Sequence, residues 1–423
     1  MPQDVLIIGA GLGGLLLALG LQRAGHKVTV YEKADFDRAL QTGGLVQFGD
    51  LGGGISLTTN GASVLRDFGV WQQVRGAGGP IDSCTFRRMD GSVIAHVIER
   101  KEEAEDHAVF VLRSTVHALL TTAALKAGVK LYVCKTLEAI EQEAGRVTAV
   151  FKDGTSAIGT VLIGADGIHS KTRSLIFDPV ENDDFPIFTG SQGYVGVSNL
   201  DDNDPLLKQV ESGLSFFTDS KTQNSVELMF ASPTRLSWRI SDYSKQGQEV
   251  ESWAPATNLP REAGRLAVLV KEWGAPAYVS DIIQKAIRVA PVSIYDRKSL
   301  KTWSKGNVTL MGDAAHGMPP HLGQGTNQAF EDVAVLTELF TRYPEDVPFC
   351  FKMYEATRIK RTTEFAENTR KMGAAQYTKS PVSRFMGELG IKLFVFALNY
   401  MGLRFSWDWR KELEKELKKA GRA

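Results

Sequence analysis

The feature that most constrains the fold is a strand, a glycine-rich turn and a helix at the start of the chain. The apolar run 5–8 leads directly into the turn GAGLGG of residues 9–14, and residues 15–24 follow with the composition of a buried helix. A second apolar run, 27–31, ends at Glu32. This order is typical of the βαβ unit that binds the ADP part of a dinucleotide. It predicts a parallel, Rossmann-like α/β sheet.

Each glycine of this turn has its own physical role. Gly9 permits a tight turn, Gly11 lets a pyrophosphate approach the backbone, and Gly14 allows the helix to pack closely on the strand. The helix N-terminus would face the phosphates. The Glu32 carboxylate is placed to accept hydrogen bonds from ribose hydroxyls. We therefore expect an ADP moiety here, with a purely structural turn as the alternative.

A second glycine-rich segment, 312–332, reads GDAAHGMPPHLGQGTNQAFED. Residues 308–311 predict a buried strand, and Asp313 follows it, placed to accept hydrogen bonds from a polyol or ribityl hydroxyl. Two prolines fix the backbone, and the start of a predicted helix would point free N–H groups at an anion or an electron-rich ring edge. The alternative is a glycine-rich connection with a capping aspartate. The residues expected beside the ligand are Gly323, Gly325, Thr326 and Asn327.

A third turn, GADG at residues 164–167, follows the apolar run 161–163 and precedes a polar segment. It lies far from the other two turns in sequence. Asp166 alone would be typical of a helix cap, and this alternative stays open.

In this order the three turns closely resemble those of the single-component FAD-dependent aromatic hydroxylases. This is the class of para-hydroxybenzoate and salicylate hydroxylases, with their fungal secondary-metabolite relatives. The resemblance covers nearly the whole chain. Residues 9–14 with Glu32 resemble the family's ADP-binding fingerprint, residues 164–167 its DG motif, and Gly312 with Asp313 its GD motif.

The resemblance implies specific contacts with the cofactor. Asp313 would bind the ribityl chain or the pyrophosphate region of FAD, residues 323–327 would approach the isoalloxazine ring, and the turn around Asp166 would serve both FAD and the nicotinamide nucleotide. The run 111–113 resembles the segment whose arginine, here Arg113, reaches FAD. The glycine run that contains Gly53 resembles a flavin-proximal loop. Extra residues around 41–50 precede this loop, so no cofactor role is assigned to Arg38.

The chemistry implied is that of a monooxygenase with bound FAD. NAD(P)H, with NADPH as the expected donor, reduces FAD, and O2 then adds at flavin C4a. The hydroperoxide hydroxylates or epoxidises an electron-rich aromatic, indolic or polyketide small molecule. No metal site is predicted. The chain has no second GxGxxG turn, which argues against a separate NAD(P)H domain.

Two other functions stay open. One is an FAD-dependent dehydrogenase or reductase that inserts no oxygen, and the other is a non-catalytic flavin-binding redox sensor. A flavin-dependent tryptophan halogenase is disfavoured because the chain lacks a WxWxIP segment.

Hydrophobic periodicity predicts a discontinuous domain organisation. Residues 1–180 form the first part of the FAD-binding domain, and the alternating pattern that follows predicts a substrate lobe over 181–290. The chain returns to the FAD-binding domain over 291–375 and ends in a helical segment, 376–423. The expected fold is thus α/β: a Rossmann-like FAD-binding domain with an inserted antiparallel β-sheet substrate lobe and a C-terminal helical segment.

Within the lobe, Tyr194 and Arg239 are the candidate catalytic residues. Alternation in one sequence does not decide which face of a strand a residue occupies, so sheet core for Tyr194 and a solvated edge charge for Arg239 are the alternatives. His316 is expected to satisfy backbone groups within the GD turn, while His321 is ambiguous. Two further candidates for the substrate-covering face are Phe217 and Met229.

Composition limits the partners and the compartment. The 423 residues include 49 basic and 49 acidic side chains, which leave no net charge to favour nucleic acid. The three cysteines are scattered, which argues against zinc and against a disulfide framework, so a reducing, cytoplasmic compartment is expected. The first residues lead straight into a strand, and no signal peptide is expected. The expected partners are a small-molecule substrate and O2.

The apolar run 393–403 raises the question of membrane contact. It is too short to span a bilayer, which needs about 20 residues. A helix that closes the substrate lobe, or a dimer contact, is favoured over an interfacial anchor. The protein is accordingly expected to be a monomer or a homodimer.

Overall fold

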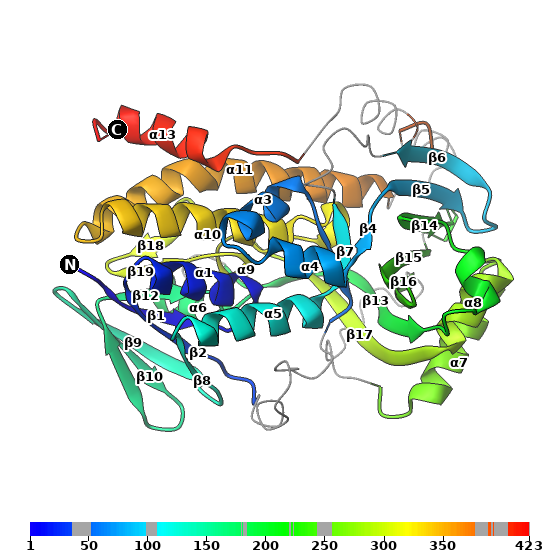
Figure 1. Cartoon of the computed structure of the whole chain (residues 1–423), viewed down its shortest axis with the longest axis horizontal. Coiled ribbons are helices and arrows are strands. Elements are labelled where there is room, and N and C mark those ends of the chain that lie inside the picture. Colours follow the sequence, from blue (N-terminus) through cyan, green and yellow to red (C-terminus); the bar gives the residue numbers. More distant parts are fainter. Residues whose placement is uncertain are drawn as a thin grey trace.

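In the part of the chain that the structure describes, the fold consists of four β-sheets and the helices that pack on them (Figure 1). The computed structural model describes residues 1–35, 52–98, 108–178, 180, 184–219, 221–222, 224–242, 256–376, 388–390, 392 and 405–422. Arg38, the insertion at 41–50 and the apolar run 393–403 lie outside these residues.

A six-stranded sheet contains the first motif. Its strand order is β18-β19-β12-β1-β2-β8. The strands are β1 (Asp4–Ile8), β2 (Lys27–Tyr31), β8 (Lys130–Tyr132), β12 (Val161–Gly164), β18 (Ser304–Lys305) and β19 (Val308–Leu310).

Parallel pairing brings the three predicted turns to one edge of this sheet. β1 runs parallel to β2 and to β12, and β12 runs parallel to β19. The turn at residues 9–14 follows β1, the DG turn follows β12, and the GD turn follows β19. Since the carboxyl ends of parallel strands lie at the same edge, all three turns meet there. The predicted Rossmann-like fold is confirmed.

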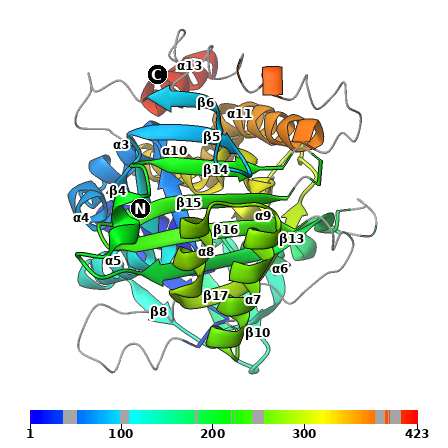
Figure 2. The same ribbon diagram turned by 90° about the vertical axis from the view of Figure 1, so that its right-hand side faces the viewer.

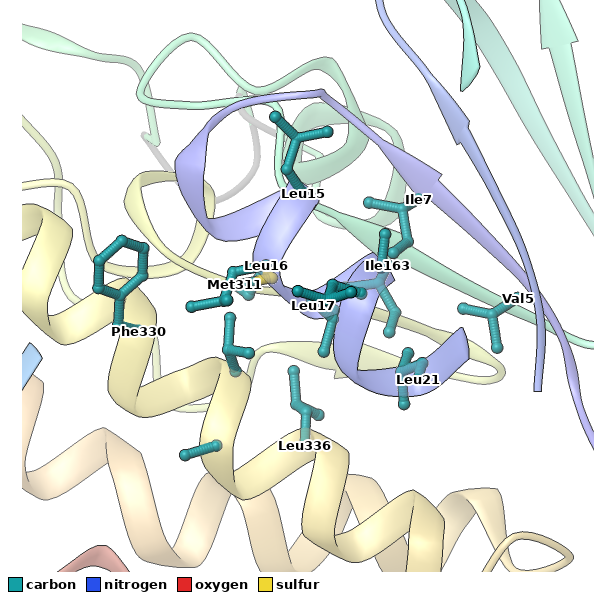
Figure 3. Close-up of a cluster of buried hydrophobic side chains, with 14 of the residues drawn as sticks. Val5, Ile7, Leu15, Leu16, Leu17, Leu21, Ile163, Met311, Phe330 and Leu336 are labelled. Carbon is teal, nitrogen blue, oxygen red and sulfur yellow. The ribbon is translucent and has the colours of Figure 1, made fainter. Parts of the chain in front are cut away.

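The helix α1 (Leu12–Arg23) is buried along most of its length, which explains its run of leucines. It packs against α5 (Arg113–Lys126) and α10 (Gly325–Arg342). Figure 3 shows Leu16 and Leu17 of α1 among side chains of β12, Met311 and α10. A helix that is apolar on every side is stable only where it is covered on every side. This core therefore holds the helix whose N-terminus follows Gly11.

The remaining helices extend this layer. The 30-residue helix α11 (Val347–Gln376) lies beside α10, as Figure 1 shows. The others are α3 (Thr59–Asp67), α4 (Trp71–Ala77), α6 (Lys171–Ile176), α9 (Asp313–His316) and η3 (Pro320–Leu322). The short helix η1 (Pro205–Lys208) packs in the second lobe instead.

A seven-stranded sheet forms the second lobe, in the order β17-β13-β16-β15-β14-β5-β6. All its pairs are antiparallel except β14 with β5. Two helices, α7 (Leu259–Glu272) and α8 (Ala277–Gln284), lie in front of it in Figure 2 and cover one face. The strands are β5 (Ser83–Arg88), β6 (Val93–Ile98), β13 (Ile187–Asn199), β14 (Leu214–Thr218), β15 (Ser225–Ser232), β16 (Arg235–Asp242) and β17 (Ala286–Asp296). We therefore propose that the substrate lobe also includes Ser83–Ile98.

Two small sheets complete the fold. One joins the lobes, because Phe110 and Leu112 of β7 pack with Val197 and Met229 on the face of the large sheet that α7 and α8 leave free. It consists of β3 (Gly54–Leu57), β4 (Gly79–Pro80) and β7 (Val109–Leu112). The other consists of β9 (Leu137–Glu143), β10 (Arg146–Phe151) and β11 (Ser156–Gly159).

The C-terminal helix α13 (Trp409–Lys419) packs on α10 and α11, away from the second lobe (Figure 1). Trp409, Leu413 and Leu417 are buried in the main core. Across the described ranges, we find no helix with the length and apolar character that crossing a membrane requires.

Candidate cofactor and substrate site

The turn after β1 contains two glycines that are tightly packed and one that borders empty space. Gly9 has φ +107°, and a Cβ on it would lie 2.5 Å from the carbonyl oxygen of Ala165. A Cβ on Gly14 would clash with the carbonyl oxygen of Gly9. A Cβ on Gly11, in contrast, would meet no protein atom within 4 Å. Gly9 and Gly14 are therefore required by the fold, and Gly11 leaves space beside the backbone.

The start of α1 also lacks a protein acceptor. Gly11 is the N-cap residue, and no side chain caps the helix. The nearby Glu32 carboxylate accepts hydrogen bonds from the N–H groups of Ala10 at 2.8 Å and Ala34 at 2.9 Å. These bonds hold Glu32 beside the turn, at the carboxyl end of β2. The N–H groups at the helix start remain able to bind an anion.

The DG turn uses its acid internally. Asp166 accepts hydrogen bonds from the Ser170 hydroxyl at 2.5 Å, the Thr172 N–H at 2.9 Å and the Thr172 hydroxyl at 3.0 Å. The Asp166 side chain thus secures the start of α6, which is the capping alternative left open above. The Asp166 side chain is still partly exposed, and its contact with a cofactor stays a prediction.

A buried arginine fastens the DG helix to the GD turn. Arg173 is fully buried and forms an ion pair with Asp184 at 2.6 Å. Its guanidinium also donates hydrogen bonds of 3.1 Å to the carbonyl oxygens of Ala314 and Ala315 in α9. α6 and α9 are therefore held together by one side chain.

Arg113 interacts electrostatically with Asp313 of the GD turn and with Glu32 at the end of β2. Asp313 is open to solvent, yet desolvation by the surrounding protein raises its pKa. This combination is expected of a side chain that faces a recess rather than a convex surface. Desolvation lowers the pKa of Arg113, while the charges of Asp313 and Glu32 act on it in the opposite direction. The backbone N–H of Arg113 donates to Gly53 at 3.1 Å.

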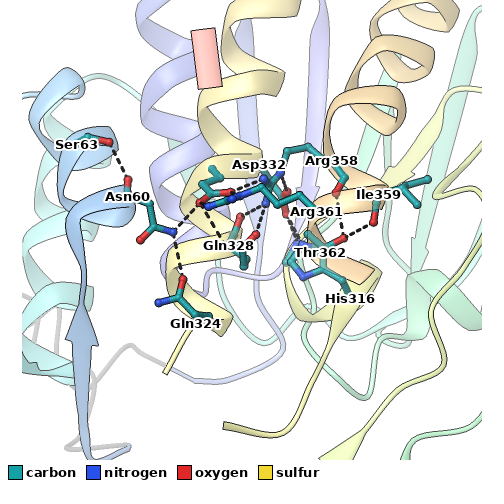
Figure 4. A network of polar contacts seen from close by, with 12 residues as sticks. Asn60, Ser63, His316, Gln324, Gln328, Asp332, Arg358, Ile359, Arg361 and Thr362 are labelled. Atoms are coloured by element: carbon teal, nitrogen blue, oxygen red, sulfur yellow. Dashed lines mark hydrogen bonds and ion pairs between the residues drawn. The ribbon is translucent and has the colours of Figure 1, made fainter. Parts of the chain in front are cut away.

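A buried ionic network connects the GD turn with α10 and α11 (Figure 4). Asp332 accepts hydrogen bonds from the Gly312 N–H at 2.9 Å, from His316 Nε2 at 2.6 Å and from Arg358 Nε at 2.8 Å. Burial alone would raise the pKa of Asp332, but His316 and Arg358 outweigh it and lower the pKa. His316 therefore has a structural role, and its partner is this carboxylate.

The network continues to the first turn of α3. Arg358 also pairs with Glu331, which binds Arg361 at 2.7 Å and the amide of Asn60 at 2.6 Å. Glu331 is 1% exposed, so its charge depends on these partners. The network thus connects α10 and α11 with α3.

Near the start of α10, two glycines leave space beside the backbone and the side chain of one asparagine is fully hydrogen-bonded. Gly323 is exposed and has φ +62°, and no side chain caps the helix that begins at Gly325. The Asn327 amide donates to Ser56 and Gly323 at 3.0 Å each, and its oxygen accepts from the Thr58 N–H at 3.1 Å. Asn327 therefore offers only its backbone to a ligand. The N–H groups of Gly325 and Thr326 face no side-chain cap.

The two predicted catalytic residues lie on opposite faces of the large sheet. Tyr194 packs with the core on the α7 side, where the Arg265 guanidinium lies 5.0 Å from its ring. Tyr194 thus lies on the side of the sheet that α7 and α8 cover, and its catalytic role stays a prediction. Arg239 occupies the other face, opposite Val195 of β13.

Arg239 acts on a histidine of the GD segment. Desolvation lowers the pKa of His321 to about 4, and the charge of Arg239 contributes to the shift. His321 belongs to η3, directly before Gly323 and the start of α10. Arg239 therefore lies near the cofactor motifs, and His321 is neutral at pH 7.

The loop that contains Gly53 lies at the junction between the lobes. A Cβ on Gly53 would lie 3.5 Å from both Val195 and Ser237 of the large sheet. The Ser237 hydroxyl accepts a 3.0 Å hydrogen bond from the N–H of Gly54. The structure thus brings the Gly53 loop, Arg113 and the Arg239 face together.

The family model described as FAD binding domain matches residues 3–369. The chain belongs to the FAD binding domain family. This flavoprotein is 30% identical over 376 residues to 3-amino-4-hydroxybenzoate 2-monooxygenase of Streptomyces platensis, with 87% of each chain covered. It is 28% identical over 389 residues to 3-hydroxybenzoate 6-hydroxylase of Polaromonas naphthalenivorans, with 88% of each covered. A salicylate hydroxylase in complex with its substrate has the same fold, with a TM-score of 0.75, 22% identity, and 99% and 98% of the two chains covered.

These comparisons confirm the predicted family, the predicted enzyme class and FAD as the cofactor. The geometry of this flavoprotein fits FAD, because Gly11 and Gly323 leave space beside two uncapped helix starts. Asp313 adds a hydrogen-bond acceptor to this site, and Arg113 adds a donor.

Several supporting residues carried no recognisable signal in the sequence. Arg173, Glu331 and Arg358 contact partners that are distant in sequence. His321 stands inside the predicted glycine-rich segment, so its place near the cofactor could be predicted. Arg239 was a candidate from the sequence, but its interaction with His321 could not be predicted.

Proposed function

We propose that this flavoprotein hydroxylates a hydroxylated aromatic carboxylic acid, with NADPH as the electron donor and O2 as the oxygen source. The observation that carries this proposal is the placement of Arg239 and His321. Arg239 acts on His321, which belongs to η3 between the GD turn and the start of α10, so a cation and a neutral imidazole are available beside the cofactor motifs. This combination suits an anionic substrate that also carries a phenolic hydroxyl.

We place each part of FAD beside a group of the described residues. The ADP part would lie at the start of α1, with its pyrophosphate beside Gly11 and its ribose at Glu32. Asp313 would accept hydrogen bonds from the ribityl chain, and Arg113 would donate to the phosphate region. The ring end would lie against Gly323 and the N–H groups of Gly325 and Thr326. When bound, FAD supplies the activation of O2 that the side chains cannot provide.

Arg239 would bind the carboxylate of the substrate. Its side chain is 18% exposed, and the guanidinium forms a 3.6 Å ion pair with Glu227. An arginine in such surroundings favours a planar carboxylate, to which it can donate two parallel hydrogen bonds. The relatives named above act on 3-amino-4-hydroxybenzoate and 3-hydroxybenzoate, which are aromatic carboxylates.

His321 would accept the phenolic proton. Its pKa of about 4 keeps it neutral, so Nδ1 or Nε2 can accept a hydrogen bond. Arg239 lowers that pKa, and a substrate carboxylate that neutralises Arg239 would raise it. Substrate binding would therefore make His321 a better proton acceptor at the moment it is needed.

NADPH would dock transiently at the FAD domain, since the sequence has one dinucleotide fingerprint. Enclosure of the substrate between the sheet and the cofactor would exclude water. We retain a cytoplasmic monomer or homodimer as the proposed state.

A dehydrogenase without oxygen insertion and a redox sensor remain the alternatives. The sensor would bind FAD without substrate-stimulated NADPH oxidation. The dehydrogenase would form a product that carries no oxygen from O2.

The test compares Arg239→Met with Arg235→Met, a change to an exposed arginine of the same strand. NADPH oxidation is measured with a panel of hydroxybenzoates and their neutral amides. Arg239→Met should raise KM for the acids about 10- to 100-fold, the effect of losing a charge-assisted hydrogen bond pair, and should leave FAD content unchanged. Arg235→Met should behave as wild type. The proposal fails if no acid stimulates oxidation, or if Arg239→Met affects acids and amides equally.

A further inference from the structure

One row of side chains crosses the whole seven-stranded sheet on the face that carries Arg239. The strand registers place one residue of each strand directly opposite the next. Figure 2 shows the order of these strands. From β17 to β6 the row is Ala290, Val195, Arg239, Glu227, Phe216, Phe86 and Ala95.

The neighbouring row on this face is part of the protein core. Val197, Met229 and Leu214 pack against Phe110 and Leu112 of β7. The row through Arg239 lies immediately beside this contact. The row through Arg239 thus carries charged side chains next to the contact between the two lobes.

Glu227 and Arg239 are incompletely satisfied. Their closest oxygen and nitrogen are 3.6 Å apart, and their side chains are 20% and 18% exposed. Within the described ranges, neither side chain forms a hydrogen bond, and their polar atoms still reach solvent. Both groups therefore keep hydrogen-bonding capacity toward a ligand. A ligand that both donates to Glu227 and accepts from Arg239 would replace solvent at both groups.

The next two positions of the row form an aromatic pair. The rings of Phe86 and Phe216 are stacked, with centroids 5.2 Å apart and an angle of 12° between their planes. Both side chains are partly exposed. Neighbouring strands are about 4.8 Å apart, so the row from Arg239 to Phe86 spans roughly 14 Å. This length exceeds what a single benzene ring requires.

We propose that Glu227 is a substrate-binding residue that selects an N–H donor adjacent to the substrate's carboxylate. The substrate class is then a fused nitrogen heteroaromatic acid, such as a hydroxylated indole-2-carboxylate. Its carboxylate binds Arg239, its ring N–H donates to Glu227, and its fused ring extends toward Phe216. In an indole-2-carboxylate the N–H and the carboxylate lie on one edge, as the adjacent pair of protein groups requires. This inference rests on the proposed function, because it assigns the same site a narrower substrate.

The competing explanation is that Glu227 only positions Arg239. In that case its loss would weaken the binding of every aromatic acid by the same factor. Recognition of the N–H predicts a different result, because only ligands that carry this donor would lose affinity. A matched pair of ligands separates the two explanations.

The experiment uses the FAD-loaded protein and two probes, 5-hydroxyindole-2-carboxylate and 5-hydroxybenzofuran-2-carboxylate. The second replaces the N–H by an oxygen and has nearly the same shape. Dissociation constants are measured by calorimetry without NADPH. Wild type should bind the indole at least about tenfold more tightly, because the benzofuran leaves a buried carboxylate unpaired. In Glu227→Met the two constants should agree within about twofold, since the acceptor is gone.

Glu211→Met is the matched control. Glu211 pairs with Arg87 at 2.6 Å, and both groups act on Tyr278 of α8, on the helix-covered side of the sheet. This variant should keep the wild-type preference for the indole. Equal binding of the probes by wild type, binding of neither, or an unchanged preference in Glu227→Met would each overturn the inference. A clear preference without any NADPH oxidation would instead overturn the proposed function while the binding role of Glu227 stands.

Discussion

Replacement of Gly11 by alanine should affect the stability of the apoprotein and the affinity for FAD in opposite directions. Gly11 has φ −70° and ψ 179°, which alanine adopts without strain, and its Cβ would meet no atom within 4 Å. A compatible Gly→Ala change stabilises a protein by about 0.4–1 kcal/mol, because it restricts the unfolded chain. The apoprotein should therefore unfold at a slightly higher temperature.

FAD binding should weaken because the new methyl group occupies the space assigned to the pyrophosphate. The displaced phosphate would lose a charge-assisted hydrogen bond to the backbone, worth about 1.5–3 kcal/mol. This corresponds to roughly a 10- to 100-fold higher Kd for FAD. The measurements are thermal unfolding of the apoprotein and titration of the apoprotein with FAD, followed by quenching of flavin fluorescence.

Two other glycines serve as controls. Gly264 lies inside α7 with no atom within 4 Å of its Cβ position, so Gly264→Ala should stabilise the apoprotein and leave FAD affinity unchanged. Gly14→Ala should prevent stable folding, because its Cβ would clash with Gly9. Wild-type FAD affinity in Gly11→Ala would refute the placement of the pyrophosphate. Destabilised apoprotein would refute the claim that Gly11 is a ligand-facing rather than a packing glycine.

Three further outcomes are expected. Arg358→Met removes the buried cation that Glu331 and Asp332 share and should lower the free energy of unfolding by about 3–5 kcal/mol, although Arg361 and His316 still pair with these carboxylates. Arg342→Met, at a pair on the surface, should cost under about 1 kcal/mol, and urea unfolding compares the two variants. Burial lowers the pKa of His117 from 6.5 to about 4. Between these two pH values the unfolded chain binds more protons than the folded protein, so acid favours unfolding. His117→Gln, which can still donate to the carbonyl of Ala10, should therefore reduce the loss of stability measured between pH 7 and pH 4.5. Tyr194→Phe should keep kcat/KM within about twofold of wild type, since the ring packs beneath α7; a tenfold loss would return Tyr194 to the site.

The sequence was sufficient to predict the elements that depend on local chemistry. The turn at residues 9–14 combines a positive φ at Gly9 with a close approach at Gly14, and only glycine satisfies both. The three predicted turns converge because each follows a parallel strand of one sheet. Such features are encoded within short segments, so periodicity and glycine spacing were sufficient to find them.

Features that depend on long-range pairing could not be predicted from the sequence. Both faces of the large sheet carry apolar and aromatic side chains together with polar ones, as in β16 (RLSWRISD), so alternation did not show that Tyr194 and Arg239 face opposite ways. The parallel pairing of β5 with β14 joins segments more than a hundred residues apart. The capping role of Asp166 and the nearness of Arg239 to His321 likewise became visible only once distant segments were placed together.

The most direct test of the central claim is oxidation of NADPH by the FAD-loaded protein under 18O2 with hydroxylated aromatic acids, followed by mass spectrometry of the products. We expect substrate-stimulated oxidation and one 18O atom in the product. A product without the label, or stimulated oxidation that yields only H2O2, would contradict the assignment of this flavoprotein as a monooxygenase of these acids.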